Sequence, residues 1–209
     1  MANRIKIKKG LQIPLLGKPE ETLLGSITSE YVQVCPEDFQ GITPKLKVKV
    51  GDTVKAGQAL FFSKMHPDMM IASPVSGTVT AINRGEKRRI LNVTVKADKE
   101  NTYVEYGKSE IGTLPPEEIK KRLLDAGIWF VIKQRPYDVV ADPGKEPRDI
   151  FVTGFDTAPL APSYDFILKG QEADLQTGLN ALARLTKGKV FLSIRSEEHT
   201  SELQSLRHL

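Results

Sequence analysis

The stretch KLKVKVGDTVKAGQALFFSKMHPDMMIASPVSGTVTAI, residues 45–82, carries the clearest structural pattern in the first half of the chain. Its opening, residues 45–50, alternates lysine with leucine or valine, which is the side-chain period of a strand with one buried and one solvated face. Turn signals follow at Gly51-Asp52, at 55–57 and at 74–77, and they divide the remainder into short apolar runs. The stretch therefore predicts several short strands joined by tight turns, in a small β-sandwich or barrel.

Further strand pairing is predicted from the same patterns. Residues 59–71 should form a hairpin with its tip at 63–68, and a turn at Gly85-Glu86 should join a strand at 78–82 to another at 89–97. One face of that last strand should be buried, and it is formed by Leu91, Val93, Val95 and Ala97.

The second half of the chain alternates helices with strands. Residues 115–126 begin with two prolines and two glutamates, the residue types favoured in a first helical turn, and a glycine follows as a stop. A second helix is predicted over 171–186 from its leucine stripe. Short apolar strands are predicted at 150–153, 166–168 and 190–194. This alternation is typical of a parallel, Rossmann-like α/β domain, and such a sheet needs more strands than the chain has left.

Together these patterns predict an α+β protein with two domains. Residues 1–100 form the β-rich domain, which also takes up a strand within 4–16 and an edge strand at 31–35. Residues 101–114 carry no sustained period and are predicted to be a linker before the incomplete α/β domain at 115–194. The remaining residues, 195–209, closely resemble the translated read-through of a sequencing-library adapter, and we predict that they are not natural sequence.

Composition excludes several classes of protein. Of the 209 residues, 40% are hydrophobic and 27% charged, as in an ordinary globular chain. No apolar run is long enough to span a bilayer and no signal peptide opens the chain, so we expect a cytoplasmic location. The single cysteine, Cys35, cannot form an internal disulfide. Basic residues gather at 4–9, 45–49 and 84–89 without interleaved aromatic residues, which argues against nucleic acid and leaves an acidic partner or an anionic membrane open.

The glycine and valine spacing over 51–60, followed by Ile-Ala-Ser-Pro-x-x-Gly-x-Val over 71–79, resembles the biotinyl/lipoyl domain and the wider group of barrel-sandwich hybrids. In the carrier members of that group, a lysine at the hairpin tip holds the prosthetic group. The corresponding position here is His66 or Pro67, neither of which can form the amide, and Lys64 lies too early. Because the spacing resembles a carrier but the tip lysine is missing, a biotinyl/lipoyl-type carrier is kept as the alternative function and not as the first.

Longer phrases resemble the NqrA family, which supplies one subunit of the sodium-pumping NADH:quinone oxidoreductases. They are IKIKKGLQIPLLGKPE (5–20), KLKVKVGDTVKAGQALF (45–61), SPVSGTVTAINRGEKRRIL (73–91), AGIWFVIKQRPYDVV (126–140) and FVTGFDTAPLAP (151–162). The resemblance implies a peripheral subunit on the cytoplasmic side of the bacterial inner membrane, without a covalent cofactor, in a complex that couples NADH oxidation and ubiquinone reduction to Na⁺ export. Flavins and an iron–sulfur centre would belong to partner subunits. Because chains of that family continue further, this chain would be an N-terminal fragment.

The corresponding subunit of the ion-pumping ferredoxin:NAD oxidoreductases is similar in its sandwich, but it carries a glycine-rich flavin and nucleotide loop and cysteine clusters. Here Ala126-Gly127-Ile128 is followed by Trp129 and Phe130, without the glycines that let a backbone approach phosphates closely. One cysteine cannot hold an iron–sulfur cluster. The sequence thus argues against flavin, nucleotide and iron–sulfur binding by this chain, and His66 alone cannot make a metal site or a catalytic triad.

Two groups of residues are candidates for partner contacts. Methionine adapts to irregular apolar surfaces, so the methionine-rich tip is predicted to dock on a partner subunit, with packing inside the sandwich as the alternative. The tip group is Met65, His66, Met69 and Met70.

A second, aromatic and cationic group is a candidate contact for quinone or for another subunit, with ordinary helix–sheet packing as the alternative. It consists of Trp129, Phe130, Lys133, Arg135 and Tyr137. We predict no catalytic residue, and a freestanding interaction module is a third possible class.

Overall fold

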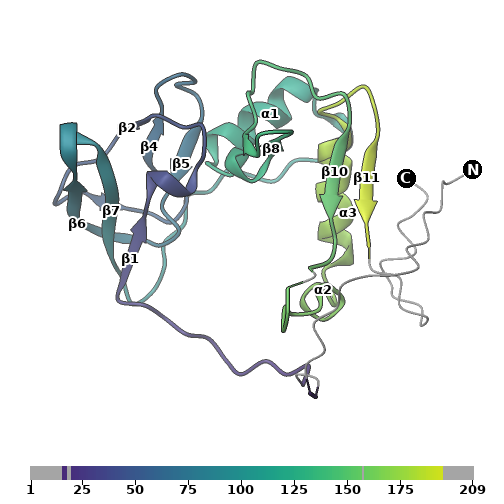
Figure 1. The fold of residues 1–209 in the computed structure, drawn as a ribbon, viewed down its shortest axis with the longest axis horizontal. Helices are drawn as coiled ribbons and strands as arrows, with labels where there is room; N and C mark the ends of the chain where they lie inside the picture. Colours follow the sequence, from purple (N-terminus) through teal and green to yellow (C-terminus); the bar gives the residue numbers. More distant parts are fainter. Residues whose placement is uncertain (1–15, 18–19, 157, 195–209) are drawn as a thin grey trace, which may run out of the picture. The chain divides into compact units, whose positions relative to one another are not determined.

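The computed structural model describes residues 16–17, 20–156 and 158–194 (Figure 1). Nearly all of the strand predicted within 4–16 lies outside the described residues, and so does the segment 195–209. None of the helices in the described ranges combines the length and the apolar composition that a membrane span requires.

The chain divides into two compact units. One comprises residues 26–150 with 177–190, and the described part of the other comprises 16–17, 20–25, 151–156, 158–176 and 191–194. The first unit contains the β-rich part of the chain together with the first long helix and the segment that follows it. The candidate residues at the hairpin tip and in the aromatic group all lie in this unit.

Two antiparallel sheets form the β-rich part. The first sheet consists, in the order in which its strands pair, of β1 (Tyr31–Val34), β7 (Ile90–Ala97), β6 (Gly77–Arg84) and β3 (Thr53–Val54). The second consists of β2 (Pro44–Leu46), β4 (Ala59–Ser63) and β5 (Met70–Ala72). The predicted turn-rich sandwich, its 59–71 hairpin and its edge strand at 31–34 are confirmed.

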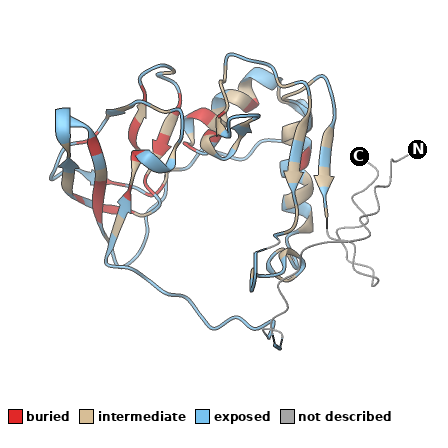
Figure 2. Ribbon diagram, in the orientation of Figure 1, coloured by how far each residue is buried: buried red, intermediate tan, exposed pale blue. Residues whose placement is uncertain are grey.

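The core of the sandwich is built from the alternating apolar residues of both sheets, which appear as the buried positions along the strands in Figure 2. Removing apolar side chains from water is the main stabilising contribution to such a fold. The buried residues of this core are Val34, Val48, Val54, Leu60, Phe61, Ile71, Val79, Ile90, Val93 and Val95.

The strand expected from residue 45 onward is shorter than its alternation suggests. Val48 is still buried, but Val50 is 60% exposed. The chain turns between them, because the Lys49 amide donates to the Asp52 carboxylate at 2.8 Å and Gly51 adopts a φ of +95°. The turn therefore interrupts the period before its last apolar residue reaches the core.

The predicted buried face of β7 is wrong at its first position. Arg84 pairs with Ile90 while Asn83 pairs with Asn92, so Leu91 is an extra residue in the ladder, a β-bulge. The bulge shifts the side-chain alternation by one residue. Ile90 is consequently buried, whereas Leu91 is exposed.

The segment predicted as a linker begins with residues that are bonded to the sandwich. The buried Ser76 hydroxyl accepts from the Thr102 amide at 3.0 Å and is within 3.1 Å of an Asp98 carboxylate oxygen. Ala56 exchanges backbone hydrogen bonds with Thr102 and Val104. Residues 98–104 are thus hydrogen-bonded to Ala56 and Ser76, which adjoin strands β3 and β6 of the first sheet. The linker predicted at 101–114 stays a prediction.

Helix α1 (Pro116–Asp125) confirms the helix predicted over 115–126. It ends where Gly127 adopts a φ of +69°, and a Cβ built there would lie 2.8 Å from the Ala72 Cβ. Only glycine tolerates both the left-handed conformation and this close approach. The helix end is therefore held against strand β5.

The chain then forms two further short strands. They are β8 (Lys133–Gln134) and β9 (Val139–Val140), which pair antiparallel after the 3₁₀ turn η4 (Trp129–Val131). A 3₁₀ turn η3 (Ile111–Thr113) precedes α1.

The last elements form an α/β unit. Strands β10 (Ile150–Thr153) and β11 (Val190–Ser193) pair and run in the same direction in Figure 1, and helix α3 (Glu172–Ala183) lies between them in the sequence. A parallel pair requires such a crossover, and the predicted α/β arrangement is confirmed. The strands are less buried than predicted, because Phe151 and Phe191 are exposed and stack at 5.0 Å between ring centroids.

The strand predicted at 166–168 is instead part of helix α2 (Tyr164–Ile167). The amides of Ile167 and Leu168 donate to the carbonyls of Ser163 and Tyr164, at 3.1 and 2.9 Å. Periodicity cannot separate a strand from a helical turn in so short an apolar run.

Candidate functional site

The tip of the β4–β5 hairpin separates its methionines into different environments. Met65 is 72% exposed, Met70 is half-buried and Met69 is 2% exposed. The hairpin closes through hydrogen bonds from the Ser63 amide to the Met69 carbonyl and from the Met69 amide to the His66 carbonyl, at 3.0 and 2.9 Å. This closure directs Met69 inward and leaves Met65 on the surface.

Met69 belongs to a second apolar cluster beside the sandwich. Its buried neighbours there are Leu124, Trp129 and Val140, which come from α1, η4 and β9. A surface at the tip can therefore use Met65, His66 and Met70, without the Met69 side chain. The neighbours of Met69 come from much later in the chain, which is why the local pattern around 63–70 did not reveal this packing.

His66 contacts the loop that follows β9. Its Nε2 atom lies 3.5 Å from a carboxylate oxygen of Asp142, and Lys145 also approaches that carboxylate at 3.7 Å. Neither distance involves a fully buried group, so these contacts contribute little to stability. Among the residues that the structure describes, no three histidine, cysteine, aspartate or glutamate side chains are grouped to hold a metal ion.

The position of Lys64 bears on the carrier alternative. Lys64 follows directly after the end of β4, and its amide donates to the Thr43 carbonyl at 2.7 Å. Lys64 therefore lies where the strand ends, while His66 and Pro67 occupy the turn itself. A swinging arm attached to Lys64 would start beside the sandwich rather than at the end of the hairpin.

The aromatic part of the second candidate group faces inward. Trp129 is 5% exposed and donates its indole N–H to the Ala141 carbonyl at 2.8 Å. Phe130 packs edge-on against Phe39 at 4.9 Å, and Phe39 packs edge-on against Phe61 at 6.0 Å. These rings form a continuous aromatic contact from η4 into the sandwich core.

The cationic part of the same group lies on the surface. Lys133, Arg135 and Tyr137 are exposed on the β8–β9 hairpin, and Arg135 lies 3.9 Å from the Asp138 carboxylate. The structure therefore does not bring the five predicted residues into one site. Trp129 and Phe130 are packing residues, and the other three form an exposed hairpin surface.

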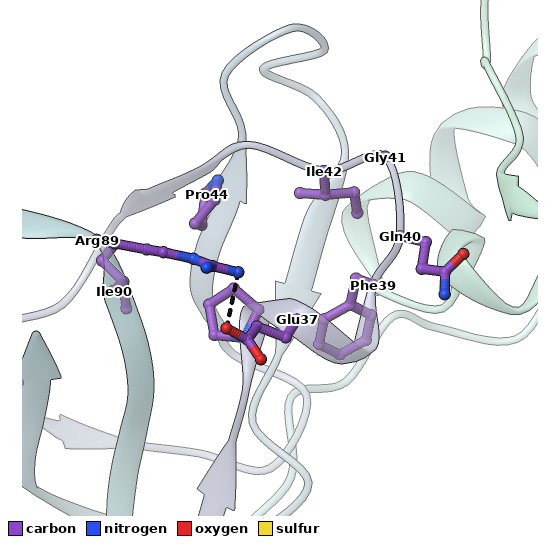
Figure 3. A pocket seen from close by; sticks show the side chains of 9 residues that line it. Glu37, Phe39, Gln40, Gly41, Ile42, Pro44, Arg89 and Ile90 are labelled. Carbon is purple, nitrogen blue, oxygen red and sulfur yellow. Dashed lines mark ion pairs between the residues drawn. The ribbon is translucent and has the colours of Figure 1, made fainter. Parts of the chain in front are cut away.

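A pocket that the sequence did not reveal lies beside the 3₁₀ turn η1 (Pro36–Asp38), with a volume of about 210 Å³. Figure 3 shows Arg89 extending across it toward Glu37, with which it forms an ion pair of 2.7 Å. The two side chains are brought together by pairing of the strands that precede η1 and follow the β6–β7 turn. The other lining residues are Pro36, Phe39, Gln40, Gly41, Ile42, Pro44 and Ile90.

Cys35 lies next to this pocket. Partial burial, together with the carboxylates of Asp38 and Glu37, raises the pKa of its thiol above the ordinary value of 9.0. The thiol therefore stays protonated near neutral pH and lacks the thiolate character that a nucleophile or a metal ligand requires.

Tyr106 connects the sandwich to helix α1. Its hydroxyl oxygen lies 2.9 Å from the Gly57 carbonyl and 3.1 Å from the Asp125 carbonyl, so the O–H can donate to either. Burial, reinforced by the charge of Asp125, raises the pKa of Tyr106 above its ordinary value of 10.0. The folded protein thus favours the neutral hydroxyl.

We expect Tyr106→Phe to lower the free energy of unfolding by about 1 kcal/mol at neutral pH, because the hydrogen bond is lost. Since the folded-state pKa is raised, the tyrosine's contribution is complete below about pH 10 and is lost as the pH rises through the folded-state pKa. The difference between wild type and variant should therefore shrink in alkali, as measured by urea unfolding followed through Trp129 fluorescence.

Tyr103→Phe is the matched control for this experiment. Tyr103 is 65% exposed, so losing its hydroxyl should change the stability by less than about 0.5 kcal/mol at either pH. Equal effects of the two substitutions would contradict the proposed bridge between sandwich and helix.

Comparisons with known proteins agree with this architecture. The family model of the NqrA N-terminal barrel-sandwich hybrid domain matches residues 5–98, and that of the NqrA second alpha/beta domain matches residues 114–208. The second match extends over most of 195–209, and the assignment of that segment to an adapter stays a prediction.

Curated relatives are named as one and the same subunit of the Na(+)-translocating NADH-quinone reductase. The protein from Haemophilus influenzae (strain PittGG) is 38% identical over 187 residues, which cover 88% of this chain and 42% of the relative. That from Histophilus somni (strain 2336) is 38% identical over 190 residues, covering 90% of this chain and 43% of the relative. That from Photorhabdus laumondii subsp. laumondii is 38% identical over 188 residues, covering 89% and 42%. The chain thus spans less than half the length of these relatives.

Two facing sheets of short strands, followed by a helix and a parallel βαβ unit, define a barrel-sandwich hybrid joined to an α/β domain. The matches to both family models extend over nearly all of the described residues. The chain belongs to the NqrA family.

Proposed function

We propose that this chain is the N-terminal part of the accessory NqrA subunit of a Na⁺-translocating NADH:quinone reductase, and that it acts as a non-catalytic scaffold. NADH oxidation and electron relay through flavins and an iron–sulfur centre reside on other subunits. The subunit lies peripherally on the cytoplasmic side of the bacterial inner membrane. Family membership and the names of the relatives support this function.

One structural observation carries the choice of scaffold over carrier. The hairpin that would bear an arm in a carrier is instead fixed by Met69, which is buried in the cluster with Leu124, Trp129 and Val140, and His66 lies next to Asp142. A carrier needs a modifiable lysine at the moving end of that hairpin, and the turn holds His66 and Pro67 there. The fixed hairpin favours a surface that holds a complex together.

The exposed part of the tip, formed by Met65, His66 and Met70, is the docking surface that we propose for a partner subunit. Methionine side chains are flexible, so they adapt to the irregular apolar surface of a partner. We expect Met65→Glu to reduce recovery of the subunit with its complex at least about tenfold, because an apolar contact would be replaced by a buried charge. Recovery is measured by affinity purification through a membrane subunit.

Val50→Glu is the matched control, since Val50 is similarly exposed at a turn of the same domain. It should leave recovery unchanged. If Met65→Glu assembles as well as Val50→Glu does, the tip is not the docking surface.

The proposed quinone contact is confined to the exposed side of the β8–β9 hairpin. Lys133, Arg135 and Tyr137 are accessible there, whereas Trp129 is enclosed by α1, β9 and the hairpin tip. A quinone carbonyl can accept hydrogen bonds from such cationic side chains. A photoreactive quinone that crosslinks to the subunit only outside residues 128–140 would count against this contact.

The function is tested by deleting the gene in its own host. Membranes of the deletion strain should lose Na⁺-dependent NADH:quinone reductase activity, and re-expression of the full-length protein should restore it. Retention of that activity in the deletion strain would contradict membership in the complex. A freestanding interaction module predicts such retention.

A further inference from the structure

The turn between β6 and β7 carries a concentration of positive charge. Residues 84–89 read Arg-Gly-Glu-Lys-Arg-Arg, so four basic side chains and one acidic side chain give a formal charge of +3. All four basic residues are exposed, and this turn is pale blue at the end of the hairpin in Figure 2. We call residues 84–89 the basic turn.

The backbone of the basic turn is held in a defined shape. The Gly85 amide donates to the Arg89 carbonyl at 2.8 Å, and the Arg84 guanidinium donates to the Arg88 carbonyl at 3.2 Å. Lys87 and Arg88 both adopt left-handed conformations, with φ of 53° and 61°. Side chains at such positions cost free energy that glycine would avoid, and conformations of this kind concentrate at functional sites.

The charges of the basic turn are largely uncompensated. Arg89 is paired with Glu37 at 2.7 Å. For Lys87, Arg88 and Arg84, no carboxylate lies within ion-pair distance among the residues that the structure describes. Elsewhere in the first sheet, by contrast, Lys96 pairs with Glu30 at 3.3 Å.

We propose that the basic turn binds the anionic headgroups of phospholipids. This inference rests on the proposed function, under which the subunit lies next to a membrane whose cytoplasmic leaflet is negatively charged. Juxtamembrane clusters of lysine and arginine are attracted to such a surface. The turn ends a hairpin and presents charge without large apolar side chains at its tip, which fits a flat layer of headgroups better than the apolar core of a protein interface.

Phospholipid vesicles test this directly with the 209-residue chain. Binding to vesicles of equal parts phosphatidylglycerol and phosphatidylcholine is compared with binding to phosphatidylcholine alone, by co-sedimentation at low salt. Removing two charges with Lys87→Gln/Arg88→Gln should lower the partition coefficient about 25-fold. Binding of the wild type should disappear near 1 M salt, where the screening length falls to about 3 Å.

Lys45→Gln/Lys49→Gln removes the same charge from another exposed part of the sandwich and serves as the matched control. It should retain binding within about threefold, because those lysines lie outside the basic turn. Thermal unfolding of both variants verifies that they are folded. The side chains of Lys87 and Arg88 form no hydrogen bond or ion pair with the described residues, so their replacement should leave the fold intact.

Three outcomes would overturn the inference. The first is absence of wild-type binding to the anionic vesicles, and the second is an equal loss of binding in the control variant. The third is unchanged vesicle binding by Lys87→Gln/Arg88→Gln. If that variant also no longer assembles with its complex, the basic turn belongs to a contact with an acidic protein partner. Vesicle binding requires no other subunit. A failure here is therefore distinguishable from a failure of the gene-deletion test, which concerns the function alone.

Discussion

Phe61→Ala should lower the free energy of unfolding by about 3–5 kcal/mol. Phe61 is 0% exposed, belongs to the sandwich core and packs against Phe39, which in turn contacts Phe130. Its removal leaves a cavity at the point where the sandwich meets the aromatic residues that follow α1. Urea unfolding of the chain, followed by far-ultraviolet circular dichroism and by Trp129 fluorescence, measures this change.

Phe62→Ala is the matched control, since Phe62 is the next residue of the same strand and is only partly buried. Its ring lies under the Lys45 ammonium at 5.6 Å, on the solvated side of β4. We expect its loss to cost about half as much or less. Equal costs for the two phenylalanines would contradict the assignment of the buried face of β4.

The second large effect is expected at Gly77, the first residue of β6. Gly77 has a φ of +154°, and a Cβ built there would lie 1.9 Å from the Lys96 carbonyl oxygen of the neighbouring strand. Neither backbone can move aside without breaking the β6–β7 ladder. Gly77→Ala should therefore lower the free energy of unfolding by more than about 3 kcal/mol or prevent cooperative folding.

Gly112→Ala provides the comparison for this substitution. Apart from Gly112 itself and its two chain neighbours, no atom of the described residues lies within 4 Å of the position that a Cβ would occupy there, and this glycine does not adopt a positive φ. Alanine there should be neutral or should stabilise the protein by up to about 1 kcal/mol, because it restricts the unfolded chain. If urea midpoints of the two variants coincide, the close approach of β6 and β7 at Gly77 is wrong.

The sandwich was predictable because its information is local. Alternation and turn residues in 45–82 specify which side chains face inward and where the chain reverses. The prediction was wrong at Leu91 because the bulge depends on the pairing of β6 with β7. It was wrong at Val50 because a local hydrogen bond from the Lys49 amide to the Asp52 carboxylate turns the chain before the alternation ends.

The candidate sites were less predictable than the fold. Composition located a methionine-rich tip and an aromatic segment, but not that Met69 and Trp129 pack together in one cluster. Contacts between residues so far apart in the chain follow from tertiary packing, which a periodicity of a few residues does not contain. The pocket spanned by Glu37 and Arg89 was missed for the same reason.

We propose that this chain belongs to an unmodified scaffold subunit of a sodium-translocating quinone reductase. The most direct measurement is intact-mass spectrometry of the complex purified through a tag on one of its membrane subunits. We expect the full-length protein containing this chain to be recovered in equal stoichiometry, at the mass of its unmodified polypeptide. Its absence from the complex would contradict the proposed membership, and an added biotinyl or lipoyl mass would contradict the proposed role as an unmodified scaffold.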